Sequence, residues 1–170
     1  PEGDGEDGWG HLADDDDPVV ILRSTYQDLR TRLAAGSLDS AIWSWWTPEQ
    51  TLGFWVRRMA HETSVHRWDA ESAAVGVAGA QDFPDDLAAD GVDELLGWLR
   101  WEWPPEHAQV GAQGQRVLVT CGPRTWALTL HPTIVEVSSA DPSGGDDAVA
   151  MLAAPASTLL LHLWGRPSSA

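Results

Sequence analysis

The spacing of hydrophobic residues divides the chain into a helical part and a part made of short strands. Between Asp17 and Gly36, large side chains recur every three or four residues, which predicts an amphipathic helix. The residues on that face are Val19, Leu22, Tyr26, Leu29 and Leu33. Asp17 is expected to cap this helix, Pro18 suits its first turn, and Gly36 should close it.

A second, longer helix is expected from Glu49 to about Val75, because no helix-breaking residue interrupts this stretch. Thr47 and Gln50 have the spacing of a capping box, with a proline between them at the first helical position. Gly76 follows the last residue of the pattern and should end the helix. The sequence therefore predicts one uninterrupted helix through the middle of the helical part.

The pattern changes after a third predicted helix at residues 84–100. Short β-branched runs follow, separated by turn sequences: "QRVLVTCG", "TWALTLHP" and "TIVEVSSA". These runs predict an antiparallel meander, and "DAVAMLAA" is expected to add a strand. Residues 155–165 are typical of a final helix with a strongly apolar face.

The predicted elements give an α+β fold with three parts. Residues 1–16 are rich in glycine and acids and are expected to form a flexible arm. Residues 17–104 should form a helical domain, and residues 105–170 a small α+β domain with an antiparallel sheet.

The charge of the chain narrows the classes of partner. The formal net charge is −16, all ten basic residues are arginine, and residues 1–17 hold eight of the 26 acidic groups. Such a surface repels phosphate backbones and anionic lipids, so neither a nucleic acid nor a membrane is an expected partner. The sequence contains no secretory signal pattern and one cysteine, Cys121, which favours a cytoplasmic protein without an internal disulfide.

The stretch "RRMAHETSVHRWDAE" at residues 57–71 holds the candidate chemistry. It resembles the H-E-x-x-H motif of zinc proteases but contains one residue more. On a helix, Glu62 and His66 lie about 40° apart and share one face, whereas His61 lies about 140° from His66. Because the two histidines cannot share a face, the spacing excludes a protease site.

The remaining pair, Glu62 and His66, presents a carboxylate and an imidazole together. Zinc accepts both ligand types, and an open catalytic site needs three protein ligands and a water molecule. Asp69 lies one turn further along the same stripe, so it could be the third ligand or could orient His66. An ordinary hydrogen-bonded pair on a helix has the same spacing, so geometry alone leaves metal binding open.

Three blocks of sequence resemble the mycothiol-dependent maleylpyruvate isomerase family: "FWVRRMAHETSVHRWDAE", "LAADGVDELL" and "LLLHLWGR". The resemblance implies an N-terminal DinB-like helical bundle that binds zinc and a smaller α+β domain. It implies that Glu62 and His66 are metal ligands and that Arg166 takes part in activity. It also implies mycothiol, a small thiol of actinobacteria, as the cofactor whose sulfur the zinc activates.

The chain departs from the family pattern at its N-terminal end. The family's first helix carries a third metal ligand, a histidine in a His-Leu context, and should precede Asp17. Only sixteen residues stand there, and their one matching histidine, His11, lies among glycines and aspartates that do not favour a helix. We therefore expect an incomplete bundle of three helices, whose uncovered groove a second copy of the chain could fill.

Two functions of different classes follow from these observations. The first is a zinc-dependent, mycothiol-using isomerase or thiol transferase that acts on a small electrophilic substrate. In that enzyme, Arg166 would steady negative charge on the substrate. The second is a non-catalytic binding or regulatory relative with an incomplete metal site. A metal-dependent hydrolase with the same ligands is a third alternative, distinguishable by activity without a thiol.

Overall fold

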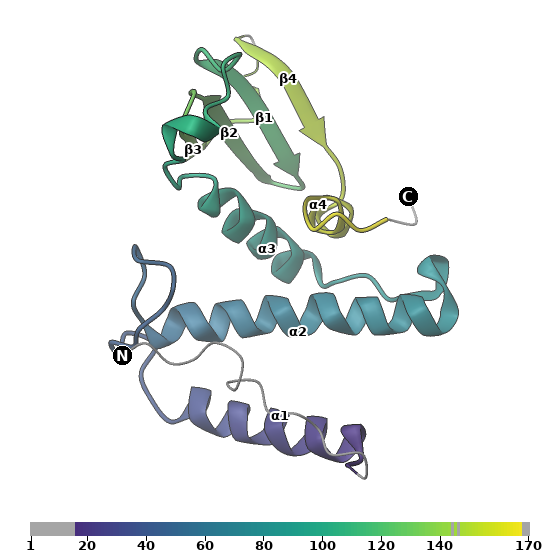
Figure 1. Ribbon diagram of the computed structural model, residues 1–170. Helices are drawn as coiled ribbons and strands as arrows, with labels where there is room; N and C mark the ends of the chain where they lie inside the picture. Colours follow the sequence, from purple (N-terminus) through teal and green to yellow (C-terminus); the bar gives the residue numbers. More distant parts are fainter. Residues whose placement is uncertain (1–15, 144, 146, 168–170) are drawn as a thin grey trace. The chain divides into compact units, whose positions relative to one another are not determined.

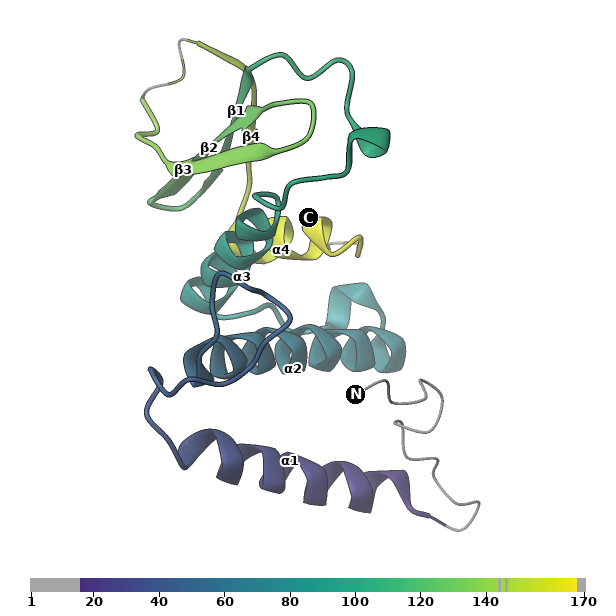
Figure 2. The same cartoon turned by 60° about the vertical axis from the view of Figure 1, so that its left-hand side comes forward.

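A computed structural model describes residues 16–143, 145 and 147–167 of the chain. It confirms the α+β class, with four α-helices and one four-stranded sheet among the described residues (Figures 1 and 2). The helices are α1 (Pro18–Ala34), α2 (Leu52–Val75), α3 (Asp85–Trp98) and α4 (Ala156–Leu163). The strands are β1 (Gln115–Cys121), β2 (Arg124–Leu130), β3 (Val135–Ser139) and β4 (Ala148–Ala153). Two compact units, residues 1–60 and 61–170, meet within α2.

The start of α1 agrees with the sequence prediction. Asp17 is its N-cap, and the Asp17 carboxylate accepts a hydrogen bond from the backbone N–H of Val19 at 2.8 Å. Pro18 occupies the first turn, where its missing N–H costs nothing. The helix ends at Ala34, two residues before the glycine expected to close it. The predicted arm and its His11 lie outside the described residues.

The predicted start of the second helix was wrong by three residues. The expected capping box at Thr47 does not form, because the side chain of Gln50 turns back to Ser44 instead. Gln50 accepts from the Ser44 N–H at 3.0 Å and donates to the Ser44 carbonyl at 2.9 Å. Helix α2 begins at Leu52, and the hydroxyl of Thr51 caps it by accepting from the N–H of Phe54 at 3.2 Å.

The sheet is mixed, which corrects the expectation of an antiparallel sheet. Its strand order is β3-β2-β1-β4, and the pairs β1–β2 and β2–β3 are antiparallel, as the predicted meander requires. Strand β4 pairs with β1 in parallel. The long connection from β3 to β4 carries the chain back to the starting end of β1, and short turn signals do not reveal such a return.

Helices α3 and α4 pack on one face of the sheet and form the main core (Figure 1). Val92 and Leu96 of α3 and Leu159 and Leu160 of α4 are each 2% exposed or less, and they contact the inward side chains of β1 and β2. Gly91 lies at the contact between the helices, where a Cβ would stand 2.9 Å from Leu160 Cδ1. The core thereby fixes the position of α4 and of the residues that follow it.

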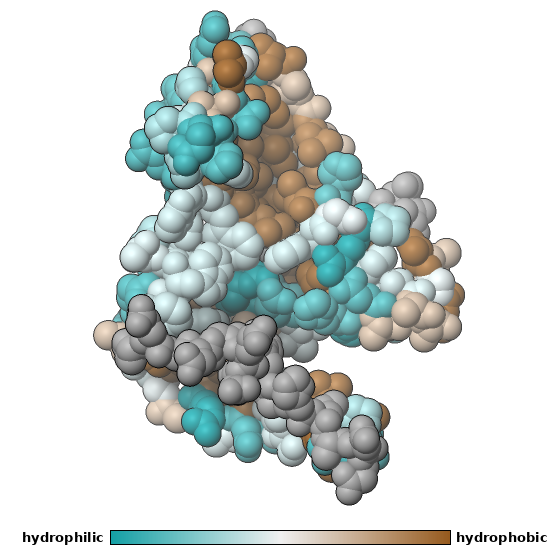
Figure 3. Space-filling view, viewed as in Figure 1, coloured by the Kyte–Doolittle hydropathy of each residue, from teal (hydrophilic) through white to brown (hydrophobic). Residues whose placement is uncertain are grey.

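The surface of the sheet region is partly apolar. Figure 3 shows hydrophobic side chains gathered over β1 and β4, and the exposed ones in β4 are Val149, Met151 and Leu152. Within the described part of the chain, no helix is long and apolar enough to cross a membrane.

Candidate functional site

Helix α2 places Glu62, His66 and Asp69 on one stripe, as the sequence predicts. Nε2 of His66 lies 3.2 Å from a carboxylate oxygen of Glu62, and Nδ1 lies 3.0 Å from Oδ2 of Asp69. The side chain of His66 is 67% exposed, so solvent and small molecules reach it. The structure thus sets one accessible imidazole between two carboxylates.

Asp69 is held in turn by Arg166, 97 residues further along the chain. Nε and Nη2 of Arg166 donate to the two carboxylate oxygens of Asp69 at 2.6 Å and 2.7 Å. These hydrogen bonds lower the pKa of Asp69, with a smaller contribution from His66, although partial burial opposes the shift. The same carboxylate raises the pKa of Arg166. Asp69 is therefore a fixed negative charge beside Nδ1 of His66 at neutral pH.

The end of α4 explains how Arg166 reaches Asp69. Gly165 adopts a positive φ of 70°, which turns the chain sharply after the helix. The N–H of Arg166 then donates back to the carbonyl of Leu161 at 2.8 Å, and its Nη1 donates to the Trp164 carbonyl at 3.0 Å. This glycine-based helix ending directs the guanidinium toward α2.

His61 lies on a different face of α2 from His66, as the spacing predicts. It is 1% exposed, and its Nδ1 lies 2.7 Å from Glu94 of α3, itself 5% exposed. Its Nε2 lies 3.1 Å from Asp90, also on α3. His61 thus forms a buried contact between two helices and takes no part in the exposed site.

The donor set of the exposed stripe fits a divalent metal in part. The Nε2 side of His66, beside the Glu62 carboxylate, presents an imidazole and a carboxylate, both of which are ligand types that zinc accepts. The carboxylate of Asp69 contacts the other ring nitrogen, Nδ1 of His66. A carboxylate at this position is what orients histidines that bind a metal. Over the described ranges, however, no group of three or more histidine, cysteine or acidic side chains converges on one point. Glu62 and His66 are therefore candidates for two ligands, and Asp69 lies against the other ring nitrogen of His66.

The contact between Asp69 and Arg166 is the part of the site that sequence reasoning missed. Both residues were singled out, Asp69 by helical spacing and Arg166 by resemblance, but nothing in the sequence joined them. One sequence signal did indicate this contact: Gly165 ends the helix, and the turn it forms sets the direction of the Arg166 side chain. Arg166 was expected to steady a substrate's negative charge, and the negative charge it contacts here is that of Asp69.

Two other side chains, Arg67 and Cys121, have structural roles. Arg67 pairs with Glu71 one turn away at 2.9 Å, so this arginine serves the helix itself. Cys121 is 2% exposed in β1, and burial raises the pKa of its thiol. A buried thiol with a raised pKa is a poor nucleophile, in keeping with a core-filling role.

Comparison with known proteins adds one match. Residues 5–71 match the family model described as "Mycothiol maleylpyruvate isomerase N-terminal domain". The matched segment contains Glu62, His66 and Asp69, and it also includes His11. No curated protein and no solved structure matches the chain. The match confirms the resemblance over the N-terminal segment.

Proposed function

We propose that this chain, whose residues 5–71 match the N-terminal domain model of the mycothiol maleylpyruvate isomerase family, is a zinc-dependent enzyme that uses mycothiol. Its reaction would be an isomerisation or thiol transfer on a small electrophilic substrate. One observation carries the proposal: Nε2 of an exposed His66 faces Glu62 while Asp69 occupies Nδ1.

Four of the described side chains have separate roles in the proposed site. Glu62 and His66 would hold the zinc, which when bound would favour the thiolate form of the cofactor's sulfur, the form that attacks electrophilic carbon. Asp69 keeps a proton on Nδ1 of His66 and leaves Nε2 available as a ligand. Arg166 holds Asp69 in place and adds a positive charge that would steady negative charge on a substrate.

His11 is the residue we propose to test as third ligand. Its surroundings argue against a helix, yet the family match begins at residue 5 and so includes it. A zinc site with three protein ligands and an open position would then be complete within this chain. If His11→Ala retains zinc as tightly as the wild type, the third ligand is not His11.

The alternative is a non-catalytic relative that binds a partner without chemistry. It is favoured by the convergence of only two ligands, Glu62 and His66, among the residues that the structure describes. Such a protein would retain no zinc after purification and would be equally stable with and without a chelator.

Cobalt substitution tests the proposed function directly. A thiolate bound to Co²⁺ gives a near-ultraviolet charge-transfer absorption, so mycothiol added to the cobalt-loaded chain should produce this band. His66→Ala should abolish the band, whereas His107→Ala, which removes a histidine outside the site, should leave it unchanged. Absence of the band in a wild-type chain that holds cobalt would exclude a metal-activated thiol. Failure to hold any metal would favour the non-catalytic alternative.

A further inference from the structure

A pocket lies in the unit formed by residues 61–170, at the end of the sheet where β2 begins. Its volume is about 370 Å³, within the range of small-molecule sites. Its lining comes from the turn before β2, from β2 itself, from the end of β3 and from α3: Asp93, Pro123, Arg124, Thr125, Trp126, Ser139 and Ala140. None of these residues belongs to the candidate metal site.

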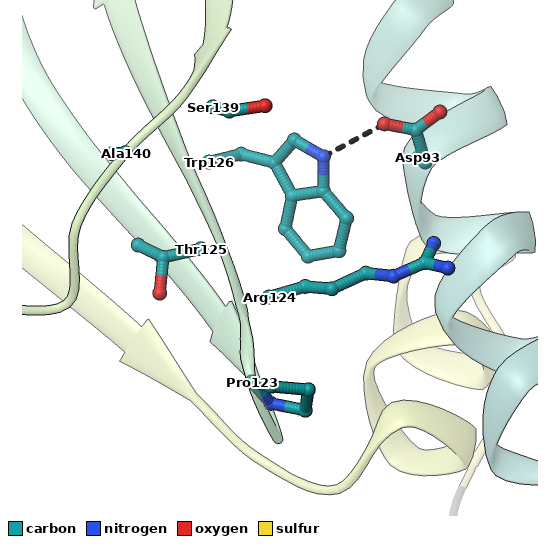
Figure 4. A pocket seen from close by; sticks show the side chains of 7 residues that line it. All are labelled: Asp93, Pro123, Arg124, Thr125, Trp126, Ser139 and Ala140. Carbon is teal, nitrogen blue, oxygen red and sulfur yellow. Dashed lines mark hydrogen bonds between the residues drawn. The ribbon is translucent and has the colours of Figure 1, made fainter.

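The walls of this pocket are fixed by the sheet and by α3. Arg124 and Trp126 lie two residues apart in β2, and residues at this spacing point to the same face of a strand. Both side chains therefore point to the face that α3 covers (Figure 4). The indole N–H of Trp126 donates to Oδ1 of Asp93 at 2.8 Å, and Trp126 pairs with Ser139 across the strands. The backbone N–H of Ala140 donates to the Thr125 carbonyl at 2.9 Å. The ring and the backbone around it are therefore held in place before any ligand arrives.

Arg124 is the unusual member of the lining. The other arginines between residues 61 and 167 are engaged: Arg67 with Glu71, Arg100 with the Val137 carbonyl, Arg116 with Asp147, and Arg166 with Asp69. Arg124 is exposed, and its guanidinium makes no ion pair or hydrogen bond to the residues that the structure describes. In a chain with 26 acidic groups and ten arginines, a guanidinium without a carboxylate partner is an available cation at the mouth of a pocket.

We infer that this pocket binds a small organic carboxylate with a flat apolar body. The planar guanidinium of Arg124 matches a carboxylate in a two-point contact, and the exposed Pro123 offers an apolar contact for a ring beside the buried Trp126. Asp93 of α3 also lines the pocket, and its negative charge disfavours ligands that carry more than one negative charge. The site thus selects a monoanion over phosphate.

Benzoate is the probe for this site, and the indole N–H signal of Trp126 is the readout. Titration of the whole ¹⁵N-labelled chain with benzoate should shift that signal and saturate, and Trp126→Phe assigns it. Arg124→Gln should weaken binding about tenfold or more, because it removes the charged two-point contact. Arg124→Lys should weaken it less, and Arg23→Gln, which removes an exposed arginine of α1, should leave it unchanged.

Several outcomes would overturn the inference. A Trp126 signal that benzoate leaves unmoved would contradict binding in this pocket. An Arg124→Gln variant that binds benzoate as the wild type does would contradict the contact with the guanidinium. Tighter binding of inorganic phosphate or of the dianion phthalate than of benzoate would contradict the proposed selectivity. Loss of benzoate binding in Glu62→Gln would assign the effect to the candidate metal site instead. Benzoate binding that survives in Glu62→Gln supports a separate site.

Discussion

The contact between α3 and α4 can be tested by adding one methyl group at Gly91. In Gly91→Ala, the new Cβ would stand 2.9 Å from Cδ1 and 3.3 Å from Cδ2 of Leu160, and 3.6 Å from Cδ2 of His61. Leu160 and His61 are each 1% exposed, so neither side chain can swing into solvent to make room. A methyl group forced into such a contact costs about 1–3 kcal/mol.

Gly97 on the same helix provides the matched control. No atom lies within 4 Å of a Cβ built there, so Gly97→Ala gains helix propensity without a clash. That gain is up to about 1 kcal/mol, somewhat less near the end of the helix. Because both variants gain propensity, the difference between their free energies of unfolding isolates the steric cost at Gly91, which we expect to be about 1–3 kcal/mol.

Urea unfolding followed by circular dichroism measures both variants, with the slope of the free energy against urea concentration as a check on unchanged compactness. Gly91→Ala should unfold at lower urea than the wild type, and Gly97→Ala at equal or higher urea. If Gly91→Ala is as stable as Gly97→Ala, the close packing of the two helices is refuted. The placement of Arg166 by α4 would then lose its support.

Three further predictions concern individual contacts. The hydrogen bonds from Arg166 hold the pKa of Asp69 below its ordinary value of 3.8, so the stability lost in Asp69→Asn should be full at pH 7 and should disappear as the pH falls below about 4. Urea unfolding of both proteins across that range measures it, and a difference that does not depend on pH contradicts the pairing. Thr51→Ala should lower the free energy of unfolding by about 1 kcal/mol because it removes the cap of α2. Thr47→Ala should change the free energy of unfolding by less than about 0.5 kcal/mol. Equal losses in the two variants would support the capping box at Thr47 instead. His61→Ala should cost about 3 kcal/mol or more, since it leaves a buried carboxylate of α3 without its imidazole, and a thermal melt close to that of the wild type would refute this contact.

The elements of the fold follow closely from local sequence, because their signals are local. Asp17 and Pro18 start α1 as expected, and the alternating pattern of "QRVLVTC" gives β1. The errors lie where a distant partner competes with the local signal. Gln50 has the spacing of a capping box with Thr47, but a tight loop brings Ser44 to it first. The parallel pairing of β4 depends on a return of the chain that no short motif encodes.

In the candidate site, too, the local contacts could be predicted from the sequence and the long-range contact could not. Helical geometry alone joins Glu62, His66 and Asp69, because they lie within two turns of one helix. The contact between Asp69 and Arg166 spans 97 residues and needs α4 to be packed in its place. The domain boundary near residue 104 and the third metal ligand both remain predictions, and His11 lies outside the described residues.

Zinc titration of the whole purified chain by calorimetry tests the central claim most directly. We expect about one zinc ion per wild-type chain, and we expect Glu62→Gln and His66→Ala to lose zinc binding. In Asp69→Asn the affinity for zinc should weaken roughly 10- to 100-fold, because this variant removes the partner that orients the imidazole. His107→Ala serves as the control and should bind as the wild type does. A wild-type chain that binds no zinc, or a His66→Ala variant that binds it unchanged, would contradict the assignment of Glu62 and His66 as metal ligands.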